Sequence, residues 1–344
     1  MRTRVHPAGM AVVDLAAGLA FLAAVCIGLS TIAVGIGLDR VRADHDGSPV
    51  FAAAFVTLVV SLVVFWAAAL VRGVPTGALS PASLWPFVLA GVLYPALFRL
   101  LYYTGVDRIG VNVTGAIGAA SPAVAGLLAI AFLGERFTAA TAAGLLAIVV
   151  GAGLLQLAEG ADAAGDDSEV SGDGTPSDGG APPETGASTD VVVRELASAG
   201  ARDLLYPLGA LVAVGVGYVL ISYGLDGFPD TVTATAVTQT AGVLALLAVL
   251  LGSADARRQV AVVSGHRAGL SFFVAAGGVV AVGWLSQFAA LGIGSVVVVV
   301  PLVNTYPLVI AAISYGLARQ LPRSPRVVAG ILAIVVGASL MQAF

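Results

Sequence analysis

The sequence predicts an all-α integral membrane protein in which ten transmembrane helices form two inverted five-helix repeats. Three observations lead to this prediction. Of the 344 residues, 58% are hydrophobic and only 10% are charged, whereas soluble domains carry about 25% charged residues. A water-soluble fold could not bury so much apolar side chain, because even large domains leave much of their surface in water. Ten apolar runs cover most of the chain, and one short sequence occurs once in each half.

Each apolar run is close to the length that a helix needs to cross a bilayer, ~20 residues. Helix is the expected structure because lipid offers the backbone no hydrogen-bond partners, so every amide must bond within its own segment. The runs also lack the strict alternation of membrane β-barrel strands. The predicted spans are 11–37, 50–71, 85–106, 110–133, 138–157, 206–224, 229–252, 268–291, 295–318 and 325–343.

The spans of the first half differ in the residues that interrupt them. Span 11–37 follows two arginines, as a signal peptide would, but its apolar run continues to Leu38 and is too long for a signal core. Span 50–71 carries no charged residue. The remaining three contain helix-breaking, charged or small residues, namely Pro95 and Arg99 in span 85–106, Pro122 in span 110–133, and Gly144 and Gly151 in span 138–157.

Between the two halves the composition changes abruptly. Residues 158–203 hold eleven acidic residues and two arginines, a net charge of −9, and since the whole chain carries −4, all other residues together sum to +5. Such a segment cannot bury enough apolar area to offset the entropy of folding. We predict an acidic disordered linker over residues 158–205. The alternative is a regulatory or partner-binding segment.

The spans of the second half carry a similar set of breaking and polar residues. Hydroxyl side chains in a membrane helix bond to the preceding turn or to a neighbouring helix. The marked positions are the hydroxyl-rich start of span 229–252 followed by Gln239, Trp284 and Gln287 in span 268–291, and Pro301 and Pro307 in span 295–318.

The sequence LAIVVGA begins at Leu146 and again at Leu332. The match extends, because residues 144–156 and 330–342 are identical at ten of thirteen positions. Further matches pair Pro122 with Pro307, Gly28 with Gly215, and the sequence GLD at 37–39 with GLD at 224–226. The chain is therefore read as two five-span copies, 1–157 and 206–344. Since five is odd, the second copy must start on the opposite side of the membrane, which makes the repeats inverted.

Two stretches carry a family resemblance. They are YYTGVDRIGVNVTGAIGAASPAVAGLLAIAFLGERFT at 102–138 and ALGIGSVVVVVPLVNTYPLVIAAISYGLARQLPRSPRVVAGILAIVVGASLM at 290–341. A proline early in the fourth span, a Gly-Glu pair at its end and a Gly-rich fifth span resemble the EamA family of the drug/metabolite transporter superfamily. The absence of lysine and the acidic linker resemble a haloarchaeal member. The second copy departs from the pattern, since Gln320 takes the position of Glu135.

The repeats and the resemblance together imply transport. Inverted repeats commonly place a substrate site near the membrane midplane between the two halves. The resemblance implies a multi-pass permease or exporter of the cell membrane that moves small, amino-acid-like metabolites by alternating access. Alternatives are a nucleotide-sugar or drug-type carrier, or a scaffold or sensor without transport that uses the acidic linker. No acid lies deep in a span, which favours exchange or facilitated movement over carboxylate-based proton coupling.

Arg99 is the charge that lies deepest within a predicted span. A cation near the bilayer centre costs about 2.5–3.5 kcal/mol on insertion scales, so a buried arginine is expected to face a cavity or a partner. Its guanidinium could hold a substrate carboxylate or phosphate through paired hydrogen bonds. The alternative is that the long side chain reaches toward the membrane surface, roughly 12 Å away at helical rise.

Paired helix breaks at matching positions of two repeats indicate a transporter site. Pro122 and Pro307 are such a pair, although both could serve only to shape the bundle. Polar side chains beside these breaks are further candidates. The predicted cavity-lining residues are Arg99, Asn112, Ser121, Pro122, Gln239, Trp284, Gln287, Asn304, Thr305, Tyr306 and Pro307. Tyr94, Tyr102, Tyr103, Tyr218 and Tyr223 are assigned either to the cavity or to the membrane interfaces.

No residue pattern indicates catalysis, a cofactor or a metal. Cys26 is the single cysteine, so no intrachain disulfide can form. His6, His45 and His266 lack metal-ligand spacing, and neither a phosphate loop nor a nucleophile with a base is present. We expect a protein that is not an enzyme and binds no cofactor, metal or nucleic acid. Its expected partners are a small-molecule substrate and the lipid bilayer, and the sequence leaves open whether it forms a homodimer.

The two indicators of membrane orientation disagree. The family resemblance implies a cytoplasmic N-terminus. That placement puts nine arginines of short loops outside and four inside, whereas cytoplasmic loops usually carry the excess of basic residues. The charge count therefore favours the opposite orientation.

Overall fold

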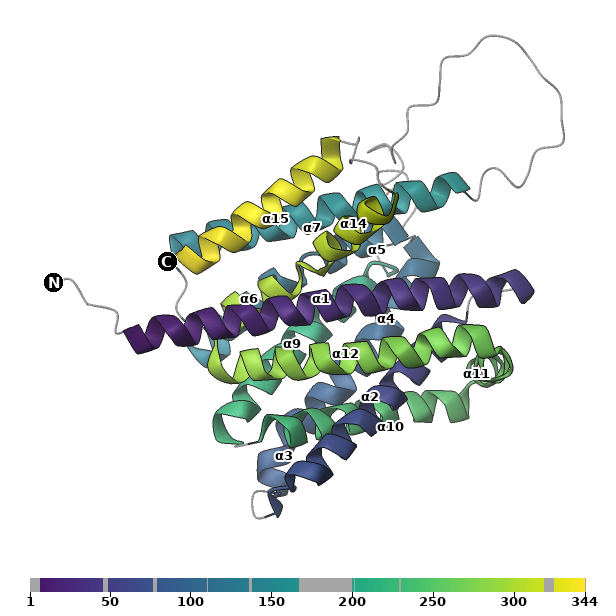
Figure 1. Cartoon of the computed structure of the whole chain (residues 1–344), viewed down its shortest axis with the longest axis horizontal. Helices are drawn as coiled ribbons and strands as arrows, with labels where there is room; N and C mark the ends of the chain where they lie inside the picture. Colours follow the sequence, from purple (N-terminus) through teal and green to yellow (C-terminus); the bar gives the residue numbers. More distant parts are fainter. Residues whose placement is uncertain are drawn as a thin grey trace, which may run out of the picture.

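The computed structural model describes residues 7–45, 49–76, 79–109, 111–135, 138–166, 200, 202–228, 230–318 and 325–343. Within these ranges all regular structure is helical, so the prediction of an all-α fold is confirmed for this part of the chain. Figure 1 shows long helices lying side by side. The helices of the first half are α1 (Pro7–Asp44), α2 (Val50–Arg72), α3 (Pro81–Gly91), η2 (Val92–Leu97), α4 (Phe98–Ile109), α5 (Val111–Gly118), α6 (Ser121–Leu133) and α7 (Ala139–Asp166).

The helices of the second half are α9 (Leu205–Gly227), α10 (Thr231–Gly252), α11 (Ala254–Gly265), α12 (Arg267–Ile293), α13 (Val296–Val303), α14 (Tyr306–Ala318) and α15 (Pro325–Ala343). The second half differs from the first in two ways: its third long helix, α12, is unbroken, and one short helix, α11, is added.

Seven helical segments of the described residues are long and apolar enough to cross a membrane. They coincide with seven of the predicted spans. The other three predicted spans coincide with shorter apolar helices, at Ser121–Leu133, Ala139–Leu154 and Pro325–Ala338. Large apolar side chains are exposed on the outside of the bundle, among them Phe132 (75%) and Leu70 (69%). Exposure of this kind suits a lipid surround better than water, so the chain is a multi-pass membrane protein.

Three predicted spans are interrupted near the prolines. Span 85–106 is broken at Tyr94, whose backbone is extended at φ −141° and ψ 108° just before Pro95. In spans 110–133 and 295–318 the helix stops for two residues immediately before the pairs Ser121-Pro122 and Tyr306-Pro307. A proline ring lacks an amide donor and clashes with the preceding turn, so a helix readily ends before it.

Two elements differ from the expectation. Helix α7 continues to Asp166, past the predicted start of the linker at residue 158, and the linker from 167 to 199 lies outside the described residues. Helix α11 was not predicted. It starts at a Ser253 hydroxyl that accepts from the Ala256 amide at 3.2 Å and buries only Ala256 and Val263. A search for runs of about 20 apolar residues passes over such a short, polar helix.

Helices from the two halves pack against each other in antiparallel pairs. Helix α1 lies along α12, and α7 lies along α15 (Figure 1). The direction of the second pair follows from its closest contacts. A Cβ on Gly151 would lie 2.7 Å from the carbonyl oxygen of Gly330, and a Cβ on Gly337 would lie 2.6 Å from that of Gly144. Since the start of each helix faces the end of the other, α7 and α15 run in opposite directions.

Gly37 and Gly224, which match between the two halves, also make equivalent contacts. A Cβ on Gly37 would lie 2.6 Å from the Phe273 ring, and a Cβ on Gly224, the matching glycine, would lie 2.6 Å from the Phe87 ring. Both rings are fully buried. Each contact joins one half of the chain to the other, so matching positions occupy matching surroundings.

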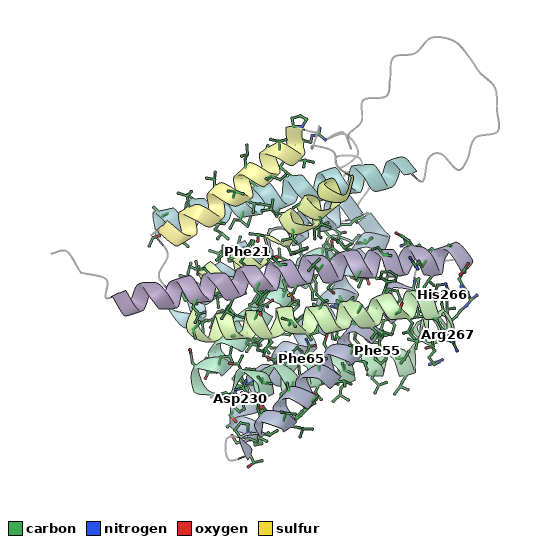
Figure 2. All side chains as sticks on the ribbon, in the orientation of Figure 1. Phe21, Phe55, Phe65, Asp230, His266 and Arg267 are labelled. Carbon is green, nitrogen blue, oxygen red and sulfur yellow. The ribbon has the colours of Figure 1, made fainter. Side chains whose placement is uncertain are left out.

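The main core lies where α9, α12 and α13 meet. Its buried members include Phe288, Val299 and Ile221, which are each fully buried. The side chains of His266 and Arg267 lie at one end of the bundle and Asp230 lies at the other (Figure 2). We call the first the α11 end, because α11 lies there. We call the second the Glu135 end, because Glu135 contacts the start of α13 there.

Candidate functional site

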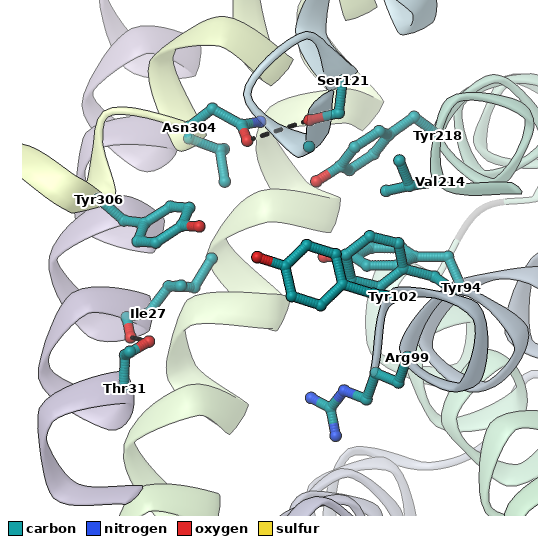
Figure 3. A pocket seen from close by; sticks show the side chains of 13 residues that line it. Ile27, Thr31, Tyr94, Arg99, Tyr102, Ser121, Val214, Tyr218, Asn304 and Tyr306 are labelled. Carbon is teal, nitrogen blue, oxygen red and sulfur yellow. Dashed lines mark hydrogen bonds between the residues drawn. The ribbon is translucent and has the colours of Figure 1, made fainter. Parts of the chain in front are cut away.

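A cavity of about 330 Å³ lies between the two halves, where the broken helices meet (Figure 3). A second cavity of about 240 Å³ shares five lining residues with it, among them Arg99 and Tyr94. The main cavity is lined by Ile27 and Thr31 of α1, Tyr94 of η2, Phe98, Arg99 and Tyr102 of α4, Gly118 and Ser121 of α5 and α6, Val214 and Tyr218 of α9, and Val303, Asn304 and Tyr306 of the α13–α14 segment.

The two breaks before Pro122 and Pro307 meet at this cavity. The Ser121 hydroxyl donates to the Asn304 side-chain oxygen at 3.4 Å, and the Asn304 amide nitrogen donates to the Val300 carbonyl at 2.8 Å (Figure 3). Helices α6 and α14 therefore both begin at the cavity wall. Helices α5 and α13 end at the same wall, at Gly118 and Val303, so helix starts and helix ends with opposite partial charges face the cavity together.

Arg99 lines both cavities, and Figure 3 shows it at the main one. It stands in the first turn of α4, just after the break at Tyr94. Its guanidinium donates to the Ala54 carbonyl oxygen of α2 at 3.3 Å. Within the described part of the chain, no acidic residue lines either cavity. The lining is thus positive where it is charged at all.

A cluster of aromatic side chains from the main core forms one wall of the cavity. The Tyr94 ring stacks on Trp284 with centroids 4.9 Å apart, and contacts Tyr218 at 5.2 Å and Phe98 at 5.6 Å. Phe98 in turn contacts Tyr102 at 5.6 Å. Such offset and tilted pairs are favourable geometries for aromatic rings. The break at Tyr94 places this ring at the centre of the cluster, because an uninterrupted helix would give its side chain a different direction.

The Glu135 end is tied across the halves by one carboxylate. Helix α6 ends at Leu133 and is capped by Gly134, which has φ +67°, a left-handed conformation that favours glycine at this position. The next residue, Glu135, accepts hydrogen bonds from the amides of Val296 at 2.7 Å and Val297 at 2.9 Å, at the start of α13. Burial raises the pKa of Glu135, the two amides oppose this, and the nearby Asp226 carboxylate adds to the increase.

The structure brings five of the predicted site residues to the cavities. Arg99, Ser121, Asn304 and Tyr306 line the main cavity, and Trp284 lines the second. Their contact with a substrate stays a prediction. Of the tyrosines left between cavity and interface, Tyr94, Tyr102 and Tyr218 line the main cavity, Tyr223 is exposed beside Trp85, and the Tyr103 side chain lies outside the described part.

The other predicted residues line neither cavity. Pro122 and Pro307 are buried in helix packing, and the Thr305 hydroxyl donates to the Leu302 carbonyl at 2.7 Å. Gln239 and Gln287 are buried, and the Gln239 side-chain oxygen and both Gln287 amide atoms have no hydrogen-bond partner among the described residues. The Asn112 side chain lies outside the described part.

Several lining residues had no signal in the sequence. Ile27 and Thr31 belong to an apolar helix with no marked polar face, and Val214 and Val303 resemble dozens of other aliphatic positions. The matching of Gly28 with Gly215 could have indicated that these helix faces lie against the breaks. Gly28 approaches Val309 of α14, and Gly215 approaches Val124 of α6.

A family comparison agrees with this architecture. The model of the EamA-like transporter family matches residues 14–157. This confirms the resemblance seen in the sequence, and the EamA family is part of the drug/metabolite transporter superfamily. The matched region contains α1 to α7 up to residue 157, which includes Arg99 and the break before Pro122.

Comparison with curated proteins gives no match. Among solved structures, one described only as "Crystal structure of protein" is 17% identical, with a TM-score of 0.58 over 94% of this chain and 95% of that chain. At this identity the likeness concerns the fold alone. It nevertheless extends over both halves, beyond the EamA region.

Proposed function

We propose that this protein, which resembles the EamA-like transporter family over residues 14–157, is a carrier of the cell membrane that moves small, amino-acid-like metabolites by alternating access. Its ten spans form two inverted five-helix repeats, 1–157 and 206–344, joined by the acidic linker 158–205. The substrate occupies the cavity between the repeats, and swapping the conformations of the repeats turns a cavity open to one side into one open to the other.

The observation that carries this proposal is the reciprocal packing of α7 and α15. Gly151 approaches Gly330, and Gly337 approaches Gly144. These four glycines match in pairs between the copies, so one two-fold rotation that reverses the helix direction relates the two contacts. Two copies of the same orientation would instead place matching residues at the same depth in the membrane. The equal contacts of Gly37 and Gly224 with buried phenylalanine rings support the same symmetry.

The cavity supports the substrate side of the proposal. It lies at two helix breaks from different repeats, which is where transporters of this design bind their solutes. Its volume of about 330 Å³ is near the lower end of small-molecule sites, about 300–1,000 Å³. That size favours a small metabolite over a nucleotide sugar.

The function is tested by untargeted metabolite profiling of a strain that lacks the protein, followed by flux of the altered solutes in proteoliposomes of the full chain. We expect a small metabolite to change in the strain and to be carried by the purified protein. A solute of nucleotide-sugar size, or no protein-dependent flux of any altered solute, would contradict the proposal.

The inverted arrangement is tested by labelling from one side of the membrane. In a Cys26→Ser background, Thr138→Cys marks the start of α7 and Arg326→Cys marks the start of α15. A membrane-impermeant maleimide is expected to reach the two sites from opposite sides. Labelling of both from the same side would show that the copies are not inverted.

A further inference from the structure

We propose that the solute bound in this cavity carries a net negative charge, and that the Arg99 guanidinium holds its carboxylate or phosphate group. This inference rests on the proposed carrier function and narrows its substrate class to organic anions. The starting point is that Arg99 is the one charged side chain lining either cavity in the described part of the chain.

The hydrogen bonds of Arg99 leave most of its donors available. A guanidinium has five N–H donors. Among the described residues it makes one hydrogen bond, to the Ala54 carbonyl at 3.3 Å, and no ion pair. A cation within a membrane protein is costly unless it is paired or solvated. An oxyanion that accepts two parallel N–H bonds is the ligand that a planar guanidinium fits best.

The helix ends around the cavity carry opposing partial charges. Helices α6 and α14 begin at Ser121 and Tyr306, whereas α5 and α13 end at Gly118 and Val303, and all four of these residues line the cavity. The partial positive charge of a helix start and the partial negative charge of a helix end oppose each other there. The positive charge of the lining therefore comes from Arg99.

The remaining polar lining is uncharged. Tyrosine rings such as Tyr94 and Tyr218 can pack against the body of a solute. Aromatic faces also attract cations, but a cationic solute in this cavity would meet Arg99, and no carboxylate of the described residues lines the cavity to offset that charge. The lining therefore favours anionic over cationic solutes. The rest of the solute molecule can be apolar or carry hydroxyl groups.

The proposal is tested with pairs of solutes that differ in charge. Proteoliposomes of the full chain are loaded with glutamate and glutamine, aspartate and asparagine, and phosphoserine and serine, with the membrane potential clamped at zero. Efflux of each solute is measured by mass spectrometry. We expect the anion of a carried pair to leave about ten-fold faster or more, the size of effect expected from one charge-assisted contact. The phosphoserine pair distinguishes a phosphate site from a carboxylate site.

Variants connect the preference to Arg99. Arg99→Gln is expected to reduce the anion-to-neutral ratio to about one, and Arg99→Lys to keep the preference at a lower rate, because lysine retains the charge but loses the paired geometry. Arg258→Gln is the matched control, since Arg258 is exposed on α11 and away from both cavities. It is expected to behave as the wild type.

The outcomes separate this inference from the proposed function. Equal or faster efflux of the neutral members, or transport only of zwitterionic or cationic solutes in the wider metabolite profile, would overturn the anion site while the carrier function stands. An unchanged ratio in Arg99→Gln would do the same for the role of Arg99. If Arg99→Gln does not fold, the anion-to-neutral efflux ratios of the wild type and of Arg99→Lys still test the anion site. If no solute of any charge is carried, the proposed function itself fails.

Discussion

Glu135 is the residue whose role changes most between sequence and structure. In the sequence it is one acid near the end of a span. In the fold its carboxylate joins the two halves, because it accepts two amide hydrogen bonds from the start of α13 across 161 residues of chain. Its match in the second copy, Gln320, is neutral and lies outside the described residues. The two copies therefore differ in charge at this matching position.

The raised pKa of Glu135 gives a prediction with a definite sign. An acid with a higher pKa in the folded state binds its proton more tightly there, so its contribution to stability falls as pH rises from the ordinary pKa through the raised one. Glu135→Gln removes this titration. Thermal unfolding in detergent across this pH window should show the wild type losing stability relative to Glu135→Gln as pH rises.

The control for this measurement is Glu169→Gln, which changes one charge in the linker. It should leave the pH dependence of the wild type unchanged. A wild type that instead gains stability relative to Glu135→Gln with rising pH would mean that the two amide hydrogen bonds outweigh burial.

At the scale of helices, the α7–α15 pair depends on the absence of side chains. The backbones approach so closely at Gly151 and Gly337 that a Cβ at either would collide with a carbonyl oxygen of the partner helix. Close approach of this kind lets van der Waals contacts hold membrane helices together. The hydrophobic effect contributes little there, because lipid tails are as apolar as the helix surfaces. The repeated LAIVVGA sequence is thus explained by one shared contact that both copies must make.

Gly151→Ala and Gly337→Ala are expected to destabilise the protein by similar amounts, about 1–3 kcal/mol for overpacking. The matched control is Gly35→Ala in α1, where a Cβ would meet nothing within 4 Å. That change should be neutral or stabilising, because alanine favours helix over glycine by about 1 kcal/mol. Unfolding in detergent measures all three. Equal effects at Gly35 and Gly151 would contradict the packing seen here.

At the scale of the whole molecule, arginine is distributed very unequally between the two ends. Successive helices reverse direction, so α1, α4 and α10 end at the α11 end, and α2, α9, α12 and α15 begin there (Figure 1). At the Glu135 end the described residues include one arginine, Arg72, which pairs with Asp230 at 3.8 Å. The arginines at the α11 end are Arg40, Arg42, Arg108, Arg202, Arg257, Arg258, Arg267 and Arg326.

This distribution predicts that the α11 end faces the cytoplasm, because cytoplasmic loops carry the excess of arginine and lysine. The linker leaves the bundle at the same end, after α7. In a Cys26→Ser background, Ser177→Cys should resist an impermeant thiol reagent in intact cells and react once the membrane is opened. Reaction in intact cells would instead support the orientation that the family resemblance implies.

The sequence by itself indicated a membrane protein, the number of its apolar runs, the duplication and the positions of the helix breaks. Lipid requires long apolar helices, and a proline removes a backbone donor wherever it stands, so Pro95, Pro122 and Pro307 could be read without a structure. Only the tertiary structure decided which faces meet. It brought Ile27, Thr31 and Tyr218 to the cavity and left Gln239 and Gln287 in the packing. A helix that is apolar on all sides has no sequence periodicity that shows which side faces the other helices. Contacts between segments distant in the sequence determine that side.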